Sequence, residues 1–388
     1  MNTHKQEQAI FFSPFLKMKD THYPEVKSIS LQCSGREIAS KQELDTFSSA
    51  LANLLKASFL GANLKYSRNN IDIFDYTSLS SAMIYRRIDK LVALGWAKEI
   101  FRSKGQGKFS EVIATERLTG MFFLFSASTL PFYSIRAKRE LVELRSKDKK
   151  TITYPSCELA QTRKQQLSNY NNEMKKHKVT LEQIELNTSL YSVFSHDDMK
   201  KGGRFYGSEY QCIPSMYRQD ILINNRETIE VDYSSLHIRM LYDMDKIDIP
   251  EGDLYALQPN QSKEQRGEAK LASLITINSS TGKHGAILAL ADSLEEPYEY
   301  CKVLIESFML KHQAISHHFF TGKGLYLQFL DSKIAILVLE SLTIYLNIPV
   351  LCIHDSFIIS KINQSLLEKE MLKAYKIIMG GEAKLTAK

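Results

Sequence analysis

The spacing of apolar residues predicts an amphipathic helix over residues 79–94, followed by a two-stranded hairpin. The positions that recur at helical intervals are Ile84, Ile88, Leu91 and Val92. A serine-rich segment suited to capping precedes them, and Gly95 is placed to end the helix. "WAKEIFR" (96–102) and "FSEVIAT" (109–115) then predict two strands, joined by the basic, glycine-containing segment "SKGQGK".

An earlier apolar segment, "FSSALANLLKASFLG" (47–61), predicts another helix, so that the order of elements over 44–118 is similar to a winged helix-turn-helix. In such a domain the helix at 79–94 lies in the major groove of DNA, and the basic wing meets phosphates. The candidate DNA-binding residues are Arg86, Arg87 and Lys90 on the helix, and Lys104 and Lys108 on the wing. A winged helix that binds protein and a plain helical hairpin fit the same pattern.

The flanking segments predict the remaining domain boundaries. Residues 1–43 form an N-terminal extension. The segment 136–190 is charged and polar, which is typical of solvated helices that connect domains. We therefore expect residues 119–190 to form a helical connector, or a thumb-like element that lies along nucleic acid. From 191 to 388 strands and helices alternate, which indicates a separate domain.

Two apolar segments of that domain each contain an aspartate at a change of structure. "VLCIHDSFII" (350–359) predicts two short strands with His354 and Asp355 at the turn. "IEVDYSSLHIRMLYD" (229–243) predicts a strand and then a helix that Ser234 and Ser235 can cap, with Asp232 at the junction. Aspartate is common at turns and helix starts, so each residue taken alone is an ordinary structural one.

Between the two aspartates, "EQRGEAKLASLITINSS" (264–280) predicts a helix with two cations on one face. Arg266 and Lys270 are four residues apart, and Asn278 lies further along the same side. Such a face is usually solvated, but two fixed cations can also hold a triphosphate. Asp232 and Asp355 would then share two Mg²⁺ ions, or Mn²⁺ in their place, in a nucleotidyl-transfer site.

These segments, in this order, resemble the motifs of family A DNA polymerases and single-subunit phage-type RNA polymerases. The matching segments are "VDYSSLHIRMLYD", "RGEAKLASLITINS", "IHDSF", the earlier "DDMKKGGRFYG" (197–207), and the lead-in "LQFLDSKIAILVLESLTIYLNIPVLCIHDSF". The resemblance covers about residues 190 to 380. It implies an α+β fold with a right-hand palm, an antiparallel sheet with helices on one face, and reduced fingers.

The resemblance also assigns roles to single residues. Arg204 would contact nucleic acid near the growing end, and the backbone carbonyl of Tyr233 would be a further metal ligand. His354 would either support its turn or touch the primer end. Where the family's fingers helix has an aromatic residue and then Tyr-Gly, this chain has Leu274 and Asn278-Ser279.

The choice between ribose and deoxyribose depends, in the family pattern, on the position five residues beyond the first palm aspartate. Here that residue is His237. Its imidazole is large enough to crowd a 2′-hydroxyl, which favours deoxynucleotides. The imidazole can also donate a hydrogen bond to that hydroxyl, and so can Asn278, which would select ribose. A histidine that only packs under the fingers is the third interpretation.

Composition limits the number of domains and the classes of protein and partner to which the chain can belong. A chain of 388 residues suggests two or three domains, and a net charge of +6 permits a polyanionic partner without requiring one. The five cysteines include no Cys-x-x-Cys pair, which argues against a zinc site and a disulfide framework. Neither a signal peptide nor a membrane-spanning apolar segment is evident, so we expect a cytoplasmic protein without a membrane partner.

The sequence therefore predicts a template-directed nucleotidyltransferase, with a small DNA polymerase favoured. Its expected partners are a DNA template and primer and nucleoside triphosphates, in plasmid or phage replication. An RNA polymerase or primase with the same core, acting with RNA, is the first alternative. The second is a non-catalytic, DNA-binding replication initiator or regulator.

Overall fold

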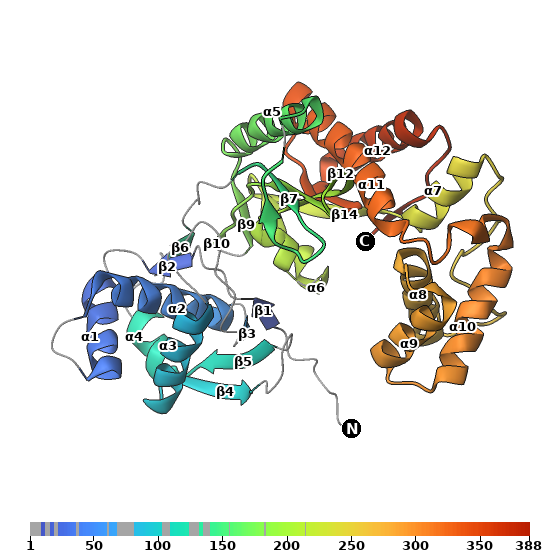
Figure 1. Ribbon diagram of the computed structural model, residues 1–388. Helices are drawn as coiled ribbons and strands as arrows, with labels where there is room; N and C mark the ends of the chain where they lie inside the picture. Colours follow the sequence, from blue (N-terminus) through green and yellow to red (C-terminus); the bar gives the residue numbers. More distant parts are fainter. Residues whose placement is uncertain are drawn as a thin grey trace. The chain divides into compact units, whose positions relative to one another are not determined.

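The computed structural model shows a mixed α+β protein with several sheets (Figure 1). It describes residues 9–11, 16–18, 22–35, 39–59, 62–67, 81–102, 109–123, 132–134, 140–154, 156–181, 184–213 and 215–388. The chain divides into two compact units. Unit 1 contains residues 1–139, 181–187 and 212–218, and unit 2 contains residues 140–180, 188–211 and 219–388.

Unit 1 combines helices with a four-stranded sheet of order β1-β3-β5-β4 and a two-stranded sheet of β2 and β6. Its helices are α1 (Tyr23–Ser34), α2 (Lys41–Phe59), α3 (Ser81–Ala93), α4 (Glu116–Phe123) and α6 (Ser215–Arg218). Its strands are β1 (Ala9–Phe11), β2 (Leu16–Met18), β3 (Asn63–Ser67), β4 (Ala97–Phe101), β5 (Phe109–Ala114), β6 (Phe132–Ser134) and β10 (Ile184–Glu185). The core of the unit is built largely on α2, which is buried along most of its length.

The helix and strands expected around residue 90 are present in unit 1. The helix expected over 79–94 is α3, and Gly95 ends it with a positive φ of 73°, a conformation that glycine adopts without strain. The two expected strands are β4 and β5, an antiparallel pair in which Ala97 lies opposite Ala114. The wing segment 103–108, with Lys104 and Lys108, lies outside the described residues. The winged-helix interpretation and its role in DNA binding stay predictions.

Unit 2 holds the segments with the candidate chemistry. Its helices are α5 (Glu158–Met174), α7 (Leu236–Asp245), α8 (Lys263–Asn278), α9 (Gly282–Leu294), α10 (Tyr298–Lys311), α11 (Gly324–Leu339) and α12 (Gln364–Met379), and its short helical segments are η3 (Gln313–His318), η4 (Glu340–Tyr345) and η5 (Lys361–Asn363). A further short segment, η2 (Glu209–Cys212), ends at the boundary with unit 1. The strands are β7 (Val142–Arg145), β8 (Thr151–Ile152), β9 (Val179–Leu181), β11 (Tyr191–Ser195), β12 (Asp198–Tyr206), β13 (Ile221–Ile223), β14 (Arg226–Tyr233), β15 (Leu351–Ile353), β16 (Ser356–Ser360) and β17 (Leu385–Ala387).

The larger sheet of unit 2 is antiparallel around β14 and runs β9-β13-β14-β16-β15, with β17 also paired to β14. Val231 of β14 lies opposite the fully buried Phe357 of β16, and α12 packs against both strands. Tyr233 at the end of β14 donates a hydrogen bond from its hydroxyl to the carbonyl of Met371 in α12, at 2.6 Å. The helix and the sheet are thereby held together directly behind the candidate site.

The second sheet of unit 2 has the order β12-β11-β7-β8 and packs against α11. Gly202 and Gly203 of β12 both have positive φ, and a Cβ at 203 would lie 2.9 Å from Phe194 and from Ser332. Only glycine therefore permits this close approach of β12 to α11. The helix α5 also contacts β12: its Arg163, which is 3% exposed, donates a hydrogen bond to the carbonyl of Gly203. Burial lowers the pKa of Arg163 to about 10.

The packing of α5 corrects the expectation of solvated helices in 136–190. Ala160, Leu167, Tyr170 and Met174 are buried, and the Tyr170 hydroxyl donates to the carbonyl of Val350 at 2.7 Å. The exposed face of α5 is polar, while its buried face combines apolar residues with one arginine and one asparagine. Because the average composition of the segment is polar, it does not reveal that a few residues of the helix are buried.

The helices α8, α9 and α10 form a small body with its own apolar core (Figure 1). The core residues are Ala272, Ala286, Ile287, Leu290, Cys301 and Ile305. A capping box starts α8: the Ser262 hydroxyl accepts from the backbone N–H of Gln265, whose side chain accepts from the backbone N–H of Ser262. The helix expected over 264–280 is confirmed. No helix within the described ranges has the length and apolar character needed to cross a membrane.

Candidate active site

The two candidate carboxylates come from neighbouring parts of the larger sheet, Asp232 from β14 and Asp355 from the turn before β16. Asp232 lies near the end of β14 opposite Ser356, the first residue of β16, and Asp355 directly precedes that residue. The backbone N–H of Tyr233 donates to the carbonyl of Asp355 at 3.2 Å, which fixes the two segments side by side. The predicted hairpin at 350–359 is confirmed, with His354 in its turn at a φ of 57°.

Burial and the nearby Asp355 make ionisation of Asp232 less favourable than that of a free carboxyl group. Burial raises the pKa of Asp232, and the negative charge of Asp355 raises it further, whereas Lys388 and Lys270 lower it. Lys388 follows β17, and its Nζ lies 3.0 Å from Asp232 Oδ2 and 3.3 Å from Glu230 Oε1. The Lys388 ammonium therefore offsets part of the negative charge of these partly buried carboxylates.

These residues fit a divalent cation. Carboxylate oxygens are the donors that Mg²⁺ and Mn²⁺ prefer, and a cation between Asp232 and Asp355 would relieve their mutual repulsion. The side chain of Tyr233 is buried and bonded to Met371, so this residue can contribute only its backbone. Lys388 was not singled out from the sequence, because its place beside Asp232 depends on the pairing of β17 with β14.

The two cations of α8 have different surroundings. The Arg266 guanidinium donates from Nε to Asp253 Oδ2 at 2.5 Å and from a terminal nitrogen to Oδ1 at 3.2 Å. Burial alone would raise the pKa of Asp253, but this pairing holds it below its ordinary value. Lys270 is exposed, and its charge lowers the pKa of Asp232.

Tyr255 is a partly buried residue that contacts Arg266 of α8 and feels the charges of the two carboxylates. The Arg266 guanidinium carbon is 5.2 Å from the centre of its ring. Burial raises the pKa of Tyr255, and the charges of Asp355 and Asp232 raise it further, while a hydrogen bond with Ser235 lowers it. Tyr255 was not predicted from the sequence, because nothing in its loop signals a contact with Arg266.

A buried ion pair joins three elements beside the carboxylates. Arg204 of β12 donates from Nε to Asp331 Oδ2 of α11 at 2.7 Å. His237 of α7 contacts both, with its Nε2 3.4 Å from an Arg204 terminal nitrogen and 3.7 Å from Asp331 Oδ2. Burial alone would raise the pKa of Asp331, but Arg204 and His237 hold it below its ordinary value. Asp331 was also missed, although an aspartate within the apolar "LQFLDSKIAILVL" is a detectable signal.

The side chain of His354 packs against another aromatic ring. Its ring lies 5.4 Å from the ring of Tyr206 in an edge-to-face arrangement. Its Nδ1 is buried with no hydrogen-bond partner within the described part of the chain. Burial lowers the pKa of His354, and the charge of Arg204 lowers it further, so the neutral imidazole is favoured. These contacts agree with a residue that supports the turn.

Asn278 is held at the end of its own helix. Its amide nitrogen donates to the carbonyl of Leu274 at 2.7 Å. Its side chain also lies against Gly324 at the start of α11, where any Cβ would collide with the amide. Gly324 therefore allows α8 to approach α11 closely, and Asn278 fills the junction.

The candidate DNA-binding cations of α3 are not equivalent. Arg86 is exposed and Lys90 half-buried. Arg87 turns towards α2, where its guanidinium lies 3.6 Å from the Glu43 carboxylate and 5.3 Å from the centre of the Phe47 ring. Arg86 is consequently the α3 cation best placed to meet an external phosphate.

Comparisons with known proteins give little beyond this geometry. No protein-family model matches the chain, and no curated protein matches its sequence. Among solved structures, the chain is similar to the POL domain of Pol1 from M. smegmatis in complex with DNA primer-template and dNTP. The TM-score is 0.36 and the identity 13%, over 59% of this chain and 51% of that chain. The match spans about half the length of that structure, and a TM-score this low does not establish a shared fold.

Proposed function

We propose that this chain is a template-directed nucleotidyltransferase, a small DNA polymerase of family A type with a palm, reduced fingers and an N-terminal winged helix. The observation that carries the proposal is the pair of Asp232, on β14, and Asp355, in the turn directly before the adjacent antiparallel strand β16. Two carboxylates in one partly buried position are costly for a fold, as the raised pKa of Asp232 shows, unless they hold cations. In this proposal the antiparallel sheet around β14 would be the palm, and α8 would be the helix of the reduced fingers.

The residues have separable roles in this reaction. Asp232, Asp355 and the backbone of Tyr233 would hold Mg²⁺ or Mn²⁺, which, when bound, activates a primer 3′-hydroxyl and stabilises the leaving pyrophosphate. Lys270 and Arg266 would hold the phosphates of the incoming nucleoside triphosphate, since two cations on one helix suit that charge. Arg266 must first exchange its contact with Asp253 for the phosphates, so Asp253 holds the guanidinium in readiness.

The direct test is a primer-extension assay with purified protein. All eight nucleotides are supplied, on DNA and on RNA templates, with Mg²⁺ or Mn²⁺. Extension of a DNA primer with deoxynucleotides on a DNA template is the expected result. Synthesis with ribonucleotides alone identifies the RNA polymerase or primase instead. No product under any of these conditions would contradict the proposal.

The rival function is a non-catalytic, DNA-binding replication initiator or regulator. The features that favour it lie on α8, where Leu274 and Asn278 replace the family's aromatic residue and tyrosine and where Arg266 is occupied by Asp253. The presence of Asp232, Asp355 and Lys270 at the positions of the family's motifs argues against this function. A domain that served only as a scaffold would not need two carboxylates and a matching cation. Duplex binding without nucleotide incorporation would favour the initiator.

The winged-helix proposal predicts a specific loss of duplex affinity on Arg86→Ala. A lost phosphate contact lowers the slope of log affinity against log salt by about 0.9 for duplex DNA. Extension of a preannealed primer should not change, because the candidate active site belongs to unit 2. Duplex binding measured by fluorescence anisotropy at several salt concentrations checks this. Lys27→Ala, at an exposed lysine of α1, is the matched control and should leave the slope unchanged.

The sugar preference is predicted to depend on His237. Replacing it by alanine should raise the ratio of ribonucleotide to deoxynucleotide incorporation at least tenfold, which corresponds to about 1.4 kcal/mol. The substitution leaves Asp331 paired with Arg204, so the surrounding fold persists. Single-nucleotide incorporation kinetics measure the ratio, and His284→Ala, on the surface of α9, should not change it. A fall in the ratio would instead identify His237 as a residue that reads ribose.

A further inference from the structure

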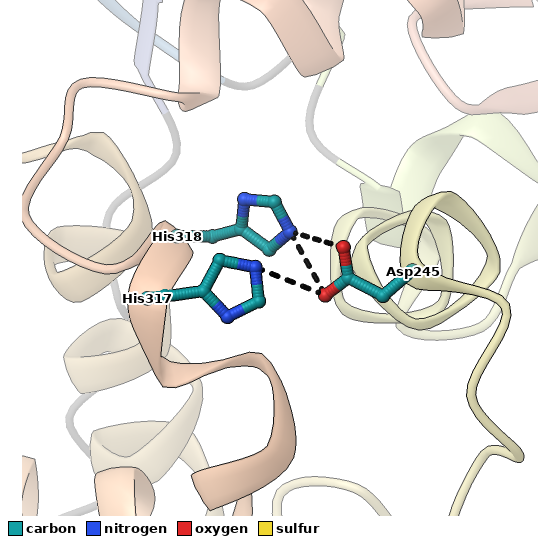
Figure 2. A group of neighbouring side chains, drawn as sticks. All are labelled: Asp245, His317 and His318. Carbon is teal, nitrogen blue, oxygen red and sulfur yellow. Dashed lines mark hydrogen bonds and ion pairs between the residues drawn. The ribbon is translucent and has the colours of Figure 1, made fainter.

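A second group of possible metal ligands lies at the far end of α7 (Figure 2). His318 Nε2 is 3.0 Å from both carboxylate oxygens of Asp245, and His317 Nε2 is 3.3 Å from Asp245 Oδ2. All three ligand atoms lie within 4.8 Å of one another. The helix α7 has 10 residues, so its length of about 15 Å separates Asp245 from the end that follows Asp232.

The orientation of the two histidines is unusual for sequence neighbours. In a 3₁₀ segment such as η3, which has three residues per turn, adjacent side chains diverge by about 120°. Here both imidazoles turn to one carboxylate, and their ring centres are only 4.1 Å apart. His317 is 61% exposed and could give its ring nitrogens to water, yet it converges on the same carboxylate that His318 already contacts through both oxygens.

A bound metal ion explains this convergence. An ion can accept one lone pair from each imidazole and one from the carboxylate. Tetrahedral Zn²⁺, with bonds of about 2.0–2.1 Å, sets its ligand atoms about 3.3 Å apart. The oxygen–nitrogen distances of 3.0 and 3.3 Å are close to that value. Mg²⁺ is a poor occupant, because it prefers oxygen ligands.

We infer that Asp245, His317 and His318 form a binding site for a divalent transition-metal ion, Zn²⁺ in the first place, with one position left to water. The absence of paired cysteines argued against zinc, but it bears only on thiolate sites. The ion joins the end of α7 to η3, which connects α10 to α11. A hydrogen bond of 2.7 Å from the Thr321 hydroxyl to the carbonyl of His318 fixes the backbone on the other side.

Cobalt titration tests this site without any need for enzymatic activity. Co²⁺ is added to the metal-stripped full chain in millimolar Mg²⁺, which occupies oxygen-rich sites, and the visible absorption of low-coordinate Co²⁺ is recorded. We expect one Co²⁺ per chain, displaced by Zn²⁺. Asp245→Asn and His318→Ala should each weaken binding at least tenfold. His317→Ala should do the same, and its exposed position spares the fold.

Matched controls separate this site from the catalytic carboxylates and from general surface binding. Asp248→Asn and His284→Ala, at residues outside the cluster, should keep the affinity of the parent protein. The double variant Asp232→Asn/Asp355→Asn should also keep it. Loss of the Co²⁺ signal in that double variant, unchanged binding in His317→Ala, or no signal in the parent chain would overturn the inference and leave Asp245 and the histidines as an ion pair.

Discussion

Asp232→Asn and Asp355→Asn are each expected to reduce primer extension by about three orders of magnitude or more, which corresponds to several kcal/mol of transition-state stabilisation. The reason is that an amide supplies no negative charge, while the proposed site would hold two divalent ions at once. Binding of primer-template should survive, since the proposed nucleic-acid contacts involve other residues. Single-turnover extension and a binding assay on the same preparations measure the two effects separately.

Loss of folding does not explain such a result for Asp232. The pKa of this carboxyl is raised in the folded state by burial and by Asp355, so the fold favours its neutral form, which asparagine resembles. Asp292→Asn, at an exposed position of α9, is the control and should extend normally. Near-normal extension by either active-site variant would show that the metal assignment is wrong.

Arg204→Ala is expected to lower the free energy of unfolding by about 3–5 kcal/mol at neutral pH, because it leaves the Asp331 carboxylate buried without its closest cation. Asp331 is 2% exposed, so water cannot compensate. Urea denaturation measures the loss. Adding Asp331→Asn to Arg204→Ala should restore part of the stability, since no uncompensated charge then remains.

The pH dependence of that loss has a definite sign. The pKa of Asp331 is lowered in the folded state, so its stabilising ion pair is fully present above the unfolded pKa of about 3.9. It disappears as the pH falls through the lower, folded pKa. The difference between wild type and Arg204→Ala should therefore shrink in acid. Arg226→Ala, at an exposed arginine, is the control and should change stability by less than about 0.5 kcal/mol. An equal loss in both variants would exclude the buried pair as the cause.

The parts of unit 2 that could be predicted from the sequence are those whose pattern is local. Strand-like residues on both sides of Asp355 gave the hairpin, and spacing gave the helix with Arg266 and Lys270. One local detail was wrong. Ser235 does occupy the start of α7, but its φ is 54° and its side chain makes no capping hydrogen bond to the helix.

The parts that could not be predicted depend on contacts between distant segments. Lys388 reaches Asp232 only because β17 pairs with β14, and that three-residue strand has no distinctive pattern. Asp331 can be suspected from its apolar surroundings, but its partner Arg204 is 127 residues away in the sequence. The cluster of Asp245 with His317 and His318 could not be predicted either, because neither segment resembles a metal-binding motif by itself.

The separation of β14 from β16 along the chain has a consequence for how the protein folds during synthesis. Ser356 donates a hydrogen bond to Glu230 across 126 residues, whereas α8, α9 and α10 pack on their immediate neighbours. Local contacts form early, and long loops close late, because closing them costs chain entropy before any contact compensates for it. On the ribosome, the three helices can therefore condense while residues 351–360 are still unmade. The two carboxylates come together only afterwards, so a nascent chain is without the proposed catalytic centre until synthesis has passed that hairpin.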